Sequence, residues 1–396
     1  MPGRRDDPRG IVILGATGQI GRLTLELISR RGGELQVRAL AARRNATGLA
    51  AAAARFQPAA VALADSAAAD RFRQAAEGRW RGEILVGAEG LATLAAWDDA
   101  EIVVNAMVGA AGLPPSLVAL QAGHRLALAN KESLVIAGAL VMQAAAESTG
   151  RLLPIDSEHS ALLQCLSGRS REEIARLILT ASGGPLRGHS AGALARVTPA
   201  EALRHPTWEM GPRITIDAAT LFNKGMELIE AHWLFDVPFE RLGVWVHPQS
   251  IVHALVEFRD GALLAHLSAP DMRLPIQYAL SHPVRWPAPI PPCDLTRAGP
   301  LGFEAPDATR FPCLRIAQEA GRAGGTAPAV ANAADEVLVV AFLSRRVPLT
   351  AIATGLETVL GRHRRVAAPS LEQILAADAW AREEAEAYAH DLGART

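Results

Sequence analysis

The fold of this chain is constrained most by an apolar segment that leads directly into a glycine-rich turn and then into a helical pattern. The segment is 11–14, the turn is Gly15-Ala-Thr-Gly18-Gln-Ile-Gly21, and leucine and isoleucine recur as far as Ile28. Glycines at such a turn let the backbone approach a pyrophosphate, which then lies at the amino end of the helix. The spacing G-x-x-G-x-x-G is related to the dinucleotide-binding fingerprint, and an ordinary strand–turn–helix is the alternative.

The next apolar segment indicates which dinucleotide binds. Residues 35–41 are predicted to form a strand, which leads to Arg43, Arg44 and Asn45. Proteins that bind NAD usually carry an acidic residue near this position, where it holds the ribose 2′-hydroxyl. Two arginines match a 2′-phosphate instead, because they can form charge-assisted hydrogen bonds with it. The sequence therefore favours NADPH, with two solvated arginines at a strand end as the alternative.

Two carboxylates follow another predicted strand. Residues 152–155 are apolar, Asp156 and Glu158 come next, and a helix is predicted from His159. If the strand extends this far, both carboxylates project from one side, roughly 6 to 7 Å apart at the backbone. Carboxylate oxygens suit a hard divalent cation such as Mg²⁺ or Mn²⁺. The alternative is that the two residues only cap the helix.

A third carboxylate lies in the segment 205–227. The β-branched run 214–217 predicts a strand, and a helix is predicted to carry Asn223, Lys224 and Glu227. Residues three and four apart share a helix face, so an amide, an ammonium and a carboxylate converge there. This set suits a phosphorylated, metal-chelating substrate, and Glu227 as a third acid favours the metal site. Glu230, one turn further on, is expected to lie on a solvated face.

Global properties favour an enzyme of the cytoplasm. A chain of 396 residues is predicted to hold two or three domains, and its formal net charge of −1 gives no reason to expect binding to nucleic acid or an anionic membrane. The three cysteines have no paired spacing, which is typical of a reducing compartment. The charged amino-terminal segment is not expected to act as a signal peptide, and no apolar stretch is expected to span a membrane.

The order of the patterns predicts an α/β fold with a Rossmann-like NADPH-binding domain, a mixed α+β catalytic domain and a carboxy-terminal helical bundle. The predicted divisions are 1–156, 157–280, a proline-rich linker at 281–312 and a helical domain at 313–396. Strands are expected near 101–105, 124–129, 174–181, 243–246 and 251–258. Pro348, Gly361 and Pro369 are expected to separate the helices of the bundle.

Together these motifs resemble the 1-deoxy-D-xylulose 5-phosphate reductoisomerase family. The resemblance runs in the same order along nearly the whole chain and rests on residues 15–21, 128–135, 155–161, 181–185, 205–235, 247–253, 270–273 and 332–336. It implies an NADPH- and metal-dependent rearrangement and reduction of 1-deoxy-D-xylulose 5-phosphate to 2-C-methyl-D-erythritol 4-phosphate, in isoprenoid-precursor biosynthesis. Retro-aldol cleavage with re-addition and ketol migration both stay open for the skeletal shift.

The resemblance also implies roles for individual residues. The metal ligands would be Asp156, Glu158 and Glu227, binding Mg²⁺ or Mn²⁺, with Co²⁺ as a further candidate. The residues in contact with the small phosphorylated sugar would be Ser157, Glu158, Ser182, His205, Trp208, Asn223, Lys224 and Glu227. Lys224, Glu158 and His205 would take part in the chemistry, and Trp208 and Met210 would lie on a flap that closes over the substrate.

For the cofactor, the resemblance implies a longer set of contacts: Thr17, Gly18, Gln19, Ile20, Arg43, Arg44, Asn45, Asn130, Lys131, Glu132, Gly211 and Met272. Family members are homodimers, so a homodimer is expected. Ala218 departs from the family pattern, because a serine that contacts the substrate phosphate usually stands there. Two other classes stay open: a metal-independent NADP-linked dehydrogenase of the semialdehyde or homoserine type, and a non-catalytic cofactor-sensing relative.

Overall fold

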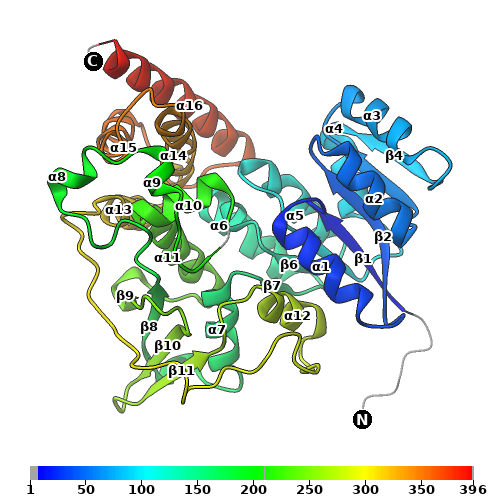
Figure 1. The fold of residues 1–396 in the computed structure, drawn as a ribbon, viewed down its shortest axis with the longest axis horizontal. Helices are drawn as coiled ribbons and strands as arrows, with labels where there is room; N and C mark the ends of the chain where they lie inside the picture. The colour runs from blue at the N-terminus through cyan, green and yellow to red at the C-terminus, as the bar shows by residue number, and fades with distance from the viewer. Residues whose placement is uncertain (1–7, 209, 395–396) are drawn as a thin grey trace. The chain divides into compact units, whose positions relative to one another are not determined.

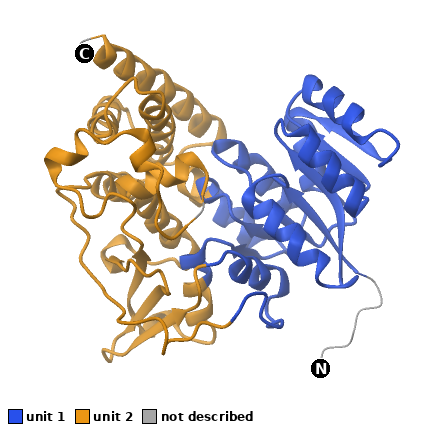
Figure 2. Cartoon of the chain, viewed as in Figure 1, with its two compact units in different colours: residues 1–133, 140–160, 271–291 blue, residues 134–139, 161–270, 292–396 orange. Residues whose placement is uncertain are grey.

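The structure is a computed structural model, and it describes residues 8–208 and 210–394. Contacts group the chain into two compact units, coloured separately in Figure 2. Unit 1 comprises residues 1–133, 140–160 and 271–291, and unit 2 comprises 134–139, 161–270 and 292–396. No helix among the described residues is both long enough and apolar enough to cross a membrane.

Unit 1 is built around a parallel sheet of seven strands in the order β4-β3-β2-β1-β5-β6-β7 (Figure 1). The strands are β1 Arg9–Leu14, β2 Leu35–Ala42, β3 Ala60–Leu63, β4 Glu83–Val86, β5 Ile102–Asn105, β6 Arg125–Leu128 and β7 Leu152–Pro154. Ile11, Val12, Ile13 and Leu14 are each 0% exposed. A strand buried on both faces is expected to be continuously apolar, as β1 is. The predicted Rossmann-like sheet is confirmed.

Helices connect the strands of unit 1. They are α1 Gln19–Ser29, α2 Ala46–Phe56, α3 Ser66–Ala76, α4 Gly87–Ala95, η1 Ala110–Gly112, α5 Leu113–Gln121 and α12 Arg273–Ser281. Two further helices, α6 Lys131–Glu147 and α7 Ser157–Cys165, begin in unit 1 and continue into residues of unit 2.

Unit 2 contains a four-stranded sheet in the order β11-β10-β8-β9. Its strands are β8 Ile174–Ala181, β9 Leu242–Val246, β10 Val252–Phe258 and β11 Leu263–Leu267. The pair β8–β9 is parallel, whereas β10 pairs with β8 and β11 in the antiparallel sense. The strands predicted near 174–181, 243–246 and 251–258 correspond to β8, β9 and β10.

The helices of unit 2 include η2 Arg171–Glu173, α8 Ala191–Leu194, α9 Pro199–Ala202, α10 Pro212–Thr220, α11 Phe222–Phe235, η3 Phe239–Arg241, α13 Cys313–Ala323, α14 Ala327–Leu343, α15 Ala351–Arg362 and α16 Leu371–Gly393. Pro348 lies between α14 and α15, and Pro369 lies before α16, as predicted. Gly361 lies inside the last turn of α15, so it does not separate two helices. The division into three domains stays a prediction.

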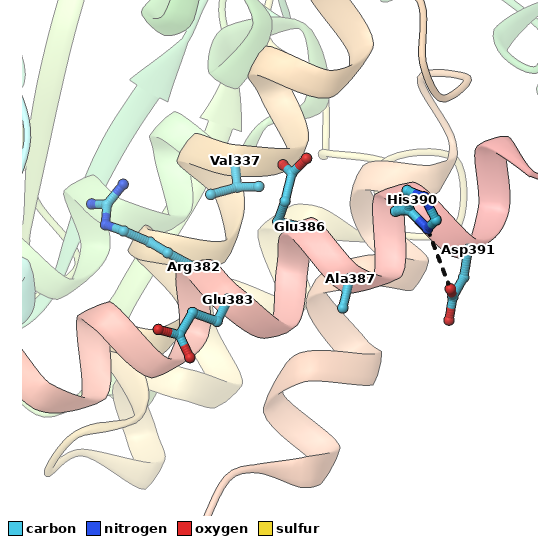
Figure 3. A pocket seen from close by; sticks show the side chains of 7 residues that line it. All are labelled: Val337, Arg382, Glu383, Glu386, Ala387, His390 and Asp391. Carbon is cyan, nitrogen blue, oxygen red and sulfur yellow. Dashed lines mark ion pairs between the residues drawn. The ribbon is translucent and has the colours of Figure 1, made fainter.

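A groove of about 680 Å³ lies along α14 and α16 (Figure 3). It is lined by Val337, Arg382, Glu383, Glu386, Ala387, His390 and Asp391. None of these residues belongs to the predicted active site, so the groove is not the candidate site.

The strand predicted at 214–217 is wrong, because these residues lie in helix α10. Pro212 stands in the first turn of α10, where a missing N–H costs nothing. Thr215 Oγ1 donates to the Gly211 carbonyl at 3.0 Å, a local bond that satisfies the hydroxyl inside a helix. Thr215, Ile216 and Ala219 share the buried face. Packing of this face therefore outweighs the β preference of the branched side chains.

The strand β7 does not reach Asp156, so the strand geometry considered for the two carboxylates does not apply. β7 ends at Pro154, and α7 begins at Ser157. Glu158 consequently lies in the first turn of a helix, where the positive end of the helix dipole favours a carboxylate. The helix predicted from His159 is confirmed, beginning two residues earlier.

Candidate active site

The glycine turn after β1 has the tight backbone that a dinucleotide requires. Gly15 has φ +86°, and a Cβ atom there would lie 2.5 Å from the Ala106 carbonyl oxygen. A Cβ atom on Gly21 would lie 2.4 Å from the Gly15 oxygen, so that residue allows α1 to pack closely on the turn. Gly18 is the N-cap of α1 and provides no side-chain cap. The first N–H groups of α1 are thus suited to a phosphate.

The two arginines predicted to select NADPH lie at the carboxyl end of β2, and both are exposed. Arg44 Nε lies 3.5 Å from Asp65 Oδ2, on a side chain that is 70% exposed. Asn45 caps α2, because its side-chain oxygen accepts from the Gly48 N–H at 2.9 Å. Ion pairs this exposed contribute little to stability, so the guanidinium of Arg44 can exchange its partner for a ligand phosphate.

Asn130 and Glu132 hold the loop after β5. The amide nitrogen of Asn130 donates to the carbonyls of Met107 and Gly109, each at 3.1 Å, and to Glu132 at 2.9 Å. Glu132 also accepts from the Gly109 N–H at 2.8 Å. Both residues are buried. They position a loop beside the end of β1, and their predicted contact with the cofactor stays a prediction.

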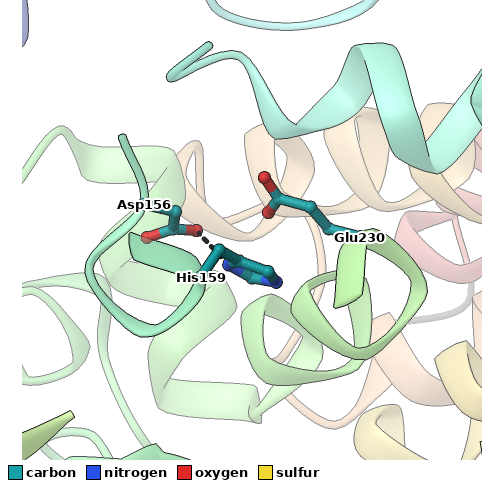
Figure 4. Close-up of side chains that lie close together, drawn as sticks. All are labelled: Asp156, His159 and Glu230. Atoms are coloured by element: carbon teal, nitrogen blue, oxygen red, sulfur yellow. Dashed lines mark ion pairs between the residues drawn. The ribbon is translucent and has the colours of Figure 1, made fainter. Parts of the chain in front are cut away.

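The first half of the predicted metal site lies between β7 and α7. Asp156 Oδ2 pairs with Lys131 Nζ at 2.7 Å, and Asp156 Oδ1 accepts from the Ser157 N–H at 3.1 Å. Ser157 Oγ donates to the Glu158 carboxylate. Asp156 also lies 3.9 Å from Nδ1 of the fully buried His159, a pair drawn in Figure 4. Two partly buried carboxylates, one of them paired with a lysine, suit a hard cation.

The second half lies on α11 in unit 2. The Glu227 carboxylate accepts from Asn223 through one oxygen and from Lys224 through the other. Lys224 and Glu227 are 4% and 2% exposed. Glu230, also on α11 (Figure 4), is 1% exposed, so the expectation that it lies on a solvated face is wrong. A row of buried charges on one helix indicates a polar site and not a hydrophobic core.

Ser182 and His205 meet in unit 2. Ser182 Oγ lies 3.0 Å from His205 Nε2. Nδ1 of His205 accepts from the backbone N–H groups of Thr207 and Trp208, at 3.2 and 2.9 Å. Because Nδ1 accepts, the ring proton lies on Nε2, which donates to Ser182. Burial lowers the pKa of His205, which favours this neutral form.

Trp208 and the buried His253 form a contact that the sequence analysis did not predict. Their ring centroids are 6.4 Å apart, and His253 Nε2 lies 2.9 Å from Ser268 Oγ. Burial lowers the pKa of His253 to about 4, and the positive charge of Lys224 acts in the same direction. His253 therefore forms a neutral support for the predicted flap. The two histidines of the segment 247–253 could have indicated this contact, but their spacing alone also suits a structural role.

The remaining predicted residues lie at or just before helix starts. Gly211 is the exposed N-cap of α10, and the half-buried Met272 is the N-cap of α12. Thr17, Gln19 and Ile20 lie in the glycine turn and the start of α1. Their contacts with a ligand stay predictions. The ion pair between Lys131 and Asp156 was missed, because it joins residues far apart in the sequence.

Comparison with protein-family models gives three matches that together extend over most of the chain. Residues 11–138 match "1-deoxy-D-xylulose 5-phosphate reductoisomerase", 152–235 match its "C-terminal domain", and 267–384 match "DXP reductoisomerase C-terminal domain". A reductoisomerase of Moorella thermoacetica is 52% identical over 384 residues, covering 96% of this chain and 98% of that protein. The reductoisomerase of Heliobacterium modesticaldum is 51% identical, covering 94% and 95%.

Solved structures of reductoisomerases are also similar to this chain. The reductoisomerase of Zymomonas mobilis in complex with NADPH has a TM-score of 0.91 and 43% identity, covering 98% of this chain and 100% of that one. A reductoisomerase in complex with NADPH, fosmidomycin and magnesium also has a TM-score of 0.91, with 39% identity and coverage of 96% and 98%. The glycine turn, the carboxylates and the matches along the chain agree: this protein belongs to the 1-deoxy-D-xylulose 5-phosphate reductoisomerase family.

Proposed function

We propose that the chain catalyses the NADPH- and divalent-metal-dependent rearrangement and reduction of 1-deoxy-D-xylulose 5-phosphate to 2-C-methyl-D-erythritol 4-phosphate. The observation that carries the proposal is the polar face of α11, where buried Glu227 accepts from Asn223 and Lys224. Burying such charges is costly, and a bound polar ligand gives a reason for it. Membership of the family supports the substrate, and relatives solved with NADPH and magnesium support both cofactors.

For the metal, we propose Asp156, Glu158 and Glu227 as ligands. Together these acids would hold the metal ion, because carboxylate oxygens match the preference of Mg²⁺ or Mn²⁺. A bound divalent ion supplies Lewis acidity at the oxygens of the substrate. Lys131 and Lys224 are each paired with one of these carboxylates, so they limit the negative charge of the ligand set.

For NADPH, the proposed cradle is the glycine turn with the start of α1. The backbone amides of this turn would hold the pyrophosphate, and Arg43 and Arg44 would bind the 2′-phosphate. Asn130 and Glu132 would support the cofactor indirectly, because their hydrogen bonds to the backbone of Met107 and Gly109 fix the loop after β5.

For the substrate phosphate, the proposed pocket lies where the Ser182 loop meets α10. Gly184 has φ +68°, and a Cβ atom there would lie 2.5 Å from the Ala218 carbonyl oxygen, so the loop packs directly on α10. Ser182 Oγ accepts from neutral His205 and from the Gly184 N–H at 3.2 Å. Its own proton is therefore available for a phosphate oxygen. Lys224 would neutralise anionic oxygen nearby, and Trp208 would exclude water.

We also propose a homodimer formed through unit 2. Strand β11 is an edge of the four-stranded sheet, and its Leu263, Leu264 and Leu267 are 51%, 38% and 37% exposed. Exposed apolar side chains on an unpaired sheet edge favour association with another chain. The cytoplasmic location stays a prediction, which rests on the unpaired spacing of the three cysteines.

The test of the function is NADPH oxidation with purified protein and 1-deoxy-D-xylulose 5-phosphate. We expect turnover with Mg²⁺ or Mn²⁺, no turnover after the ions are chelated, and recovery when either ion is added back. Turnover that survives chelation would favour the dehydrogenase class. A protein that binds NADPH tightly but never oxidises it would favour the cofactor sensor.

Ala218→Ser is expected to lower the KM for 1-deoxy-D-xylulose 5-phosphate, because the hydroxyl restores a hydrogen bond to the phosphate. A hydrogen bond to a charged group contributes about 1.5 to 3 kcal/mol, so a decrease of about tenfold or more is expected. Ala379→Ser, at an exposed position of α16, is the matched control and should leave KM unchanged. An unchanged or higher KM in Ala218→Ser would reject the account of a missing bond.

A further inference from the structure

The loop that carries Ser182 is held at its far end by part of the segment that was predicted to be a linker. This loop, 182–189, follows β8 and ends just before α8. Residues 300–310 precede α13 (Figure 1) and belong to the same unit as the loop. They contact both the loop and the end of β9, and we call them the strap.

Backbone pairing and ring stacking attach the first half of the strap to the sheet of unit 2. Val246, the last residue of β9, exchanges two backbone hydrogen bonds with Glu304, at 2.8 and 2.9 Å. The ring of the buried His247 stacks on Phe303 with centroids 4.6 Å apart, and its backbone N–H donates to the Ala181 carbonyl at 2.7 Å. Ala181 is the last residue of β8. The strap is therefore attached to the strand ends from which the loop departs.

The second half of the strap reaches the far end of the loop through Arg310. Nη1 of Arg310 donates to the backbone carbonyls of Arg187 and His189, at 3.1 and 3.0 Å. Its Nε donates to Asp307 at 2.7 Å. A guanidinium is planar and rigid, so three donors engaged on one group give it a single orientation. Both carbonyls of the loop are thereby held in place.

Asp307 orients Arg310 in turn. Its Oδ1 accepts from the backbone N–H groups of Thr309 and Arg310, at 3.1 and 2.9 Å. Hydrogen bonds from the backbone and the side chain of Arg310 lower the pKa of Asp307, so the carboxylate is ionised at neutral pH. An ion pair of Arg187 with Glu304 also joins loop and strap, but both side chains are exposed, and such pairs contribute little. The bonds of Arg310 to the backbone are thus the main connection.

The start of the loop needs such a restraint. Gly183 and Gly184 have φ of +82° and +68°, and glycine has the largest backbone freedom of any residue. The Ser182 hydroxyl accepts from the Gly184 N–H at 3.2 Å and lies 3.0 Å from His205 Nε2, so its direction depends on this backbone. Leu186 is 1% exposed and keeps the middle of the loop in the core. Loss of the connection to Arg310 would therefore loosen the loop without unfolding it.

We infer that Arg310 is a positioning residue for the substrate phosphate, because it holds the backbone of the loop 182–189 and so fixes the Ser182 hydroxyl. Arg310 acts through the loop and not on the reacting atoms. Its loss should raise the KM for the phosphorylated substrate more than it lowers kcat, since the phosphate is bound equally before and during the reaction. The inference rests on the proposed function only for the identity of the bound group.

The first test is hydrogen–deuterium exchange of the full chain, measured by mass spectrometry on peptides that cover 183–189. Arg310→Ala should raise the exchange rate of the loop about tenfold or more, because two hydrogen bonds from a charged donor are lost. The His189 N–H, which donates to the Leu186 carbonyl at 2.9 Å, is one of the amides affected. Unchanged exchange in this loop would overturn the inference. No turnover is needed, so this result is independent of the proposed function.

Arg241→Ala is the matched control. Like Arg310, Arg241 is partly buried and donates to two backbone carbonyls, those of Ile174 and Ala175, but these lie at the opposite end of β8. The variant should leave exchange in the loop 182–189 and the substrate KM unchanged. Equal effects of the two variants on the loop would show a general loss of stability and would overturn the positioning role.

The second test is steady-state kinetics with inorganic phosphate as a competing probe. Arg310→Ala should raise the KM for 1-deoxy-D-xylulose 5-phosphate about tenfold, with kcat within about threefold and the KM for NADPH unchanged. The inhibition constant of inorganic phosphate should rise by the same factor. Arg310→Lys, whose ammonium can still donate to both carbonyls, should recover part of the affinity.

A lower kcat with an unchanged KM in Arg310→Ala would overturn the role in phosphate binding. An unchanged inhibition constant of inorganic phosphate would do the same. Absence of turnover in the wild type would instead reject the proposed function, and the exchange measurement would still decide whether Arg310 holds the loop.

Discussion

Replacing Glu227 with glutamine is expected to lower kcat/KM for 1-deoxy-D-xylulose 5-phosphate by about a hundredfold to a thousandfold or more. The amide has the same shape, but it leaves the buried Lys224 ammonium, which is 4% exposed, without its carboxylate. Breaking a buried ion pair from one side costs about 3 to 5 kcal/mol. The loss of an anionic metal ligand adds to this cost, because Mg²⁺ and Mn²⁺ prefer carboxylate oxygen to neutral amide oxygen.

The measurement combines steady-state kinetics with calorimetric titration of Mn²⁺. Glu227→Gln should weaken Mn²⁺ binding, and a higher Mn²⁺ concentration should restore part of kcat. Glu230→Gln is the matched control, because Glu230 is an equally buried acid one turn further along α11. In an alternative ligand set, Glu230 would take the place of Glu227. If Glu230→Gln loses Mn²⁺ affinity and Glu227→Gln does not, Glu230 and not Glu227 is the metal ligand.

The sequence predicted elements whose patterns are local. Strand β1, the glycine turn and α1 follow one another without interruption, and each pattern is determined by its own residues. The spacing of Asn223, Lys224 and Glu227 likewise needs only the helical repeat to place them on one face. This explains why the glycine turn and the polar face of α11 were predictable before any contact was known.

Patterns that depend on tertiary packing were not predictable in the same way. The run 214–217 has the composition of a strand, but it packs one face of α10 into the core, and Pro212 favours a helix start. The hydrogen bond from Arg213 to Glu336 joins residues separated by more than a hundred positions. The burial of Glu230 has the same origin, because α11 is buried on most of its surface. The periodicity of apolar residues identifies one buried face of a helix, but it does not show which neighbouring elements cover the other faces.

Removal of both arginines after β2 is expected to abolish most of the preference for NADPH. In the variant R43A/R44A the KM for NADPH should rise about a hundredfold or more, because each charge-assisted bond to the 2′-phosphate contributes about 1.5 to 3 kcal/mol. The KM for NADH should change by less than about threefold, since NADH has no such phosphate. Stability should change little, because Arg44 and Asp65 form an exposed pair with side chains 70% and 41% exposed.

The control is Arg55→Ala, which removes an exposed positive charge from the last turn of α2 and not from its start. It should leave both cofactor constants unchanged, which separates a specific contact from a general loss of positive field. Raising the ionic strength should weaken NADPH binding to wild type and have much less effect on the double variant, because salt screens the exposed phosphate contacts. An equal loss of affinity for NADPH and NADH in the double variant would contradict the assignment, since the arginines would then act on a part that both cofactors share.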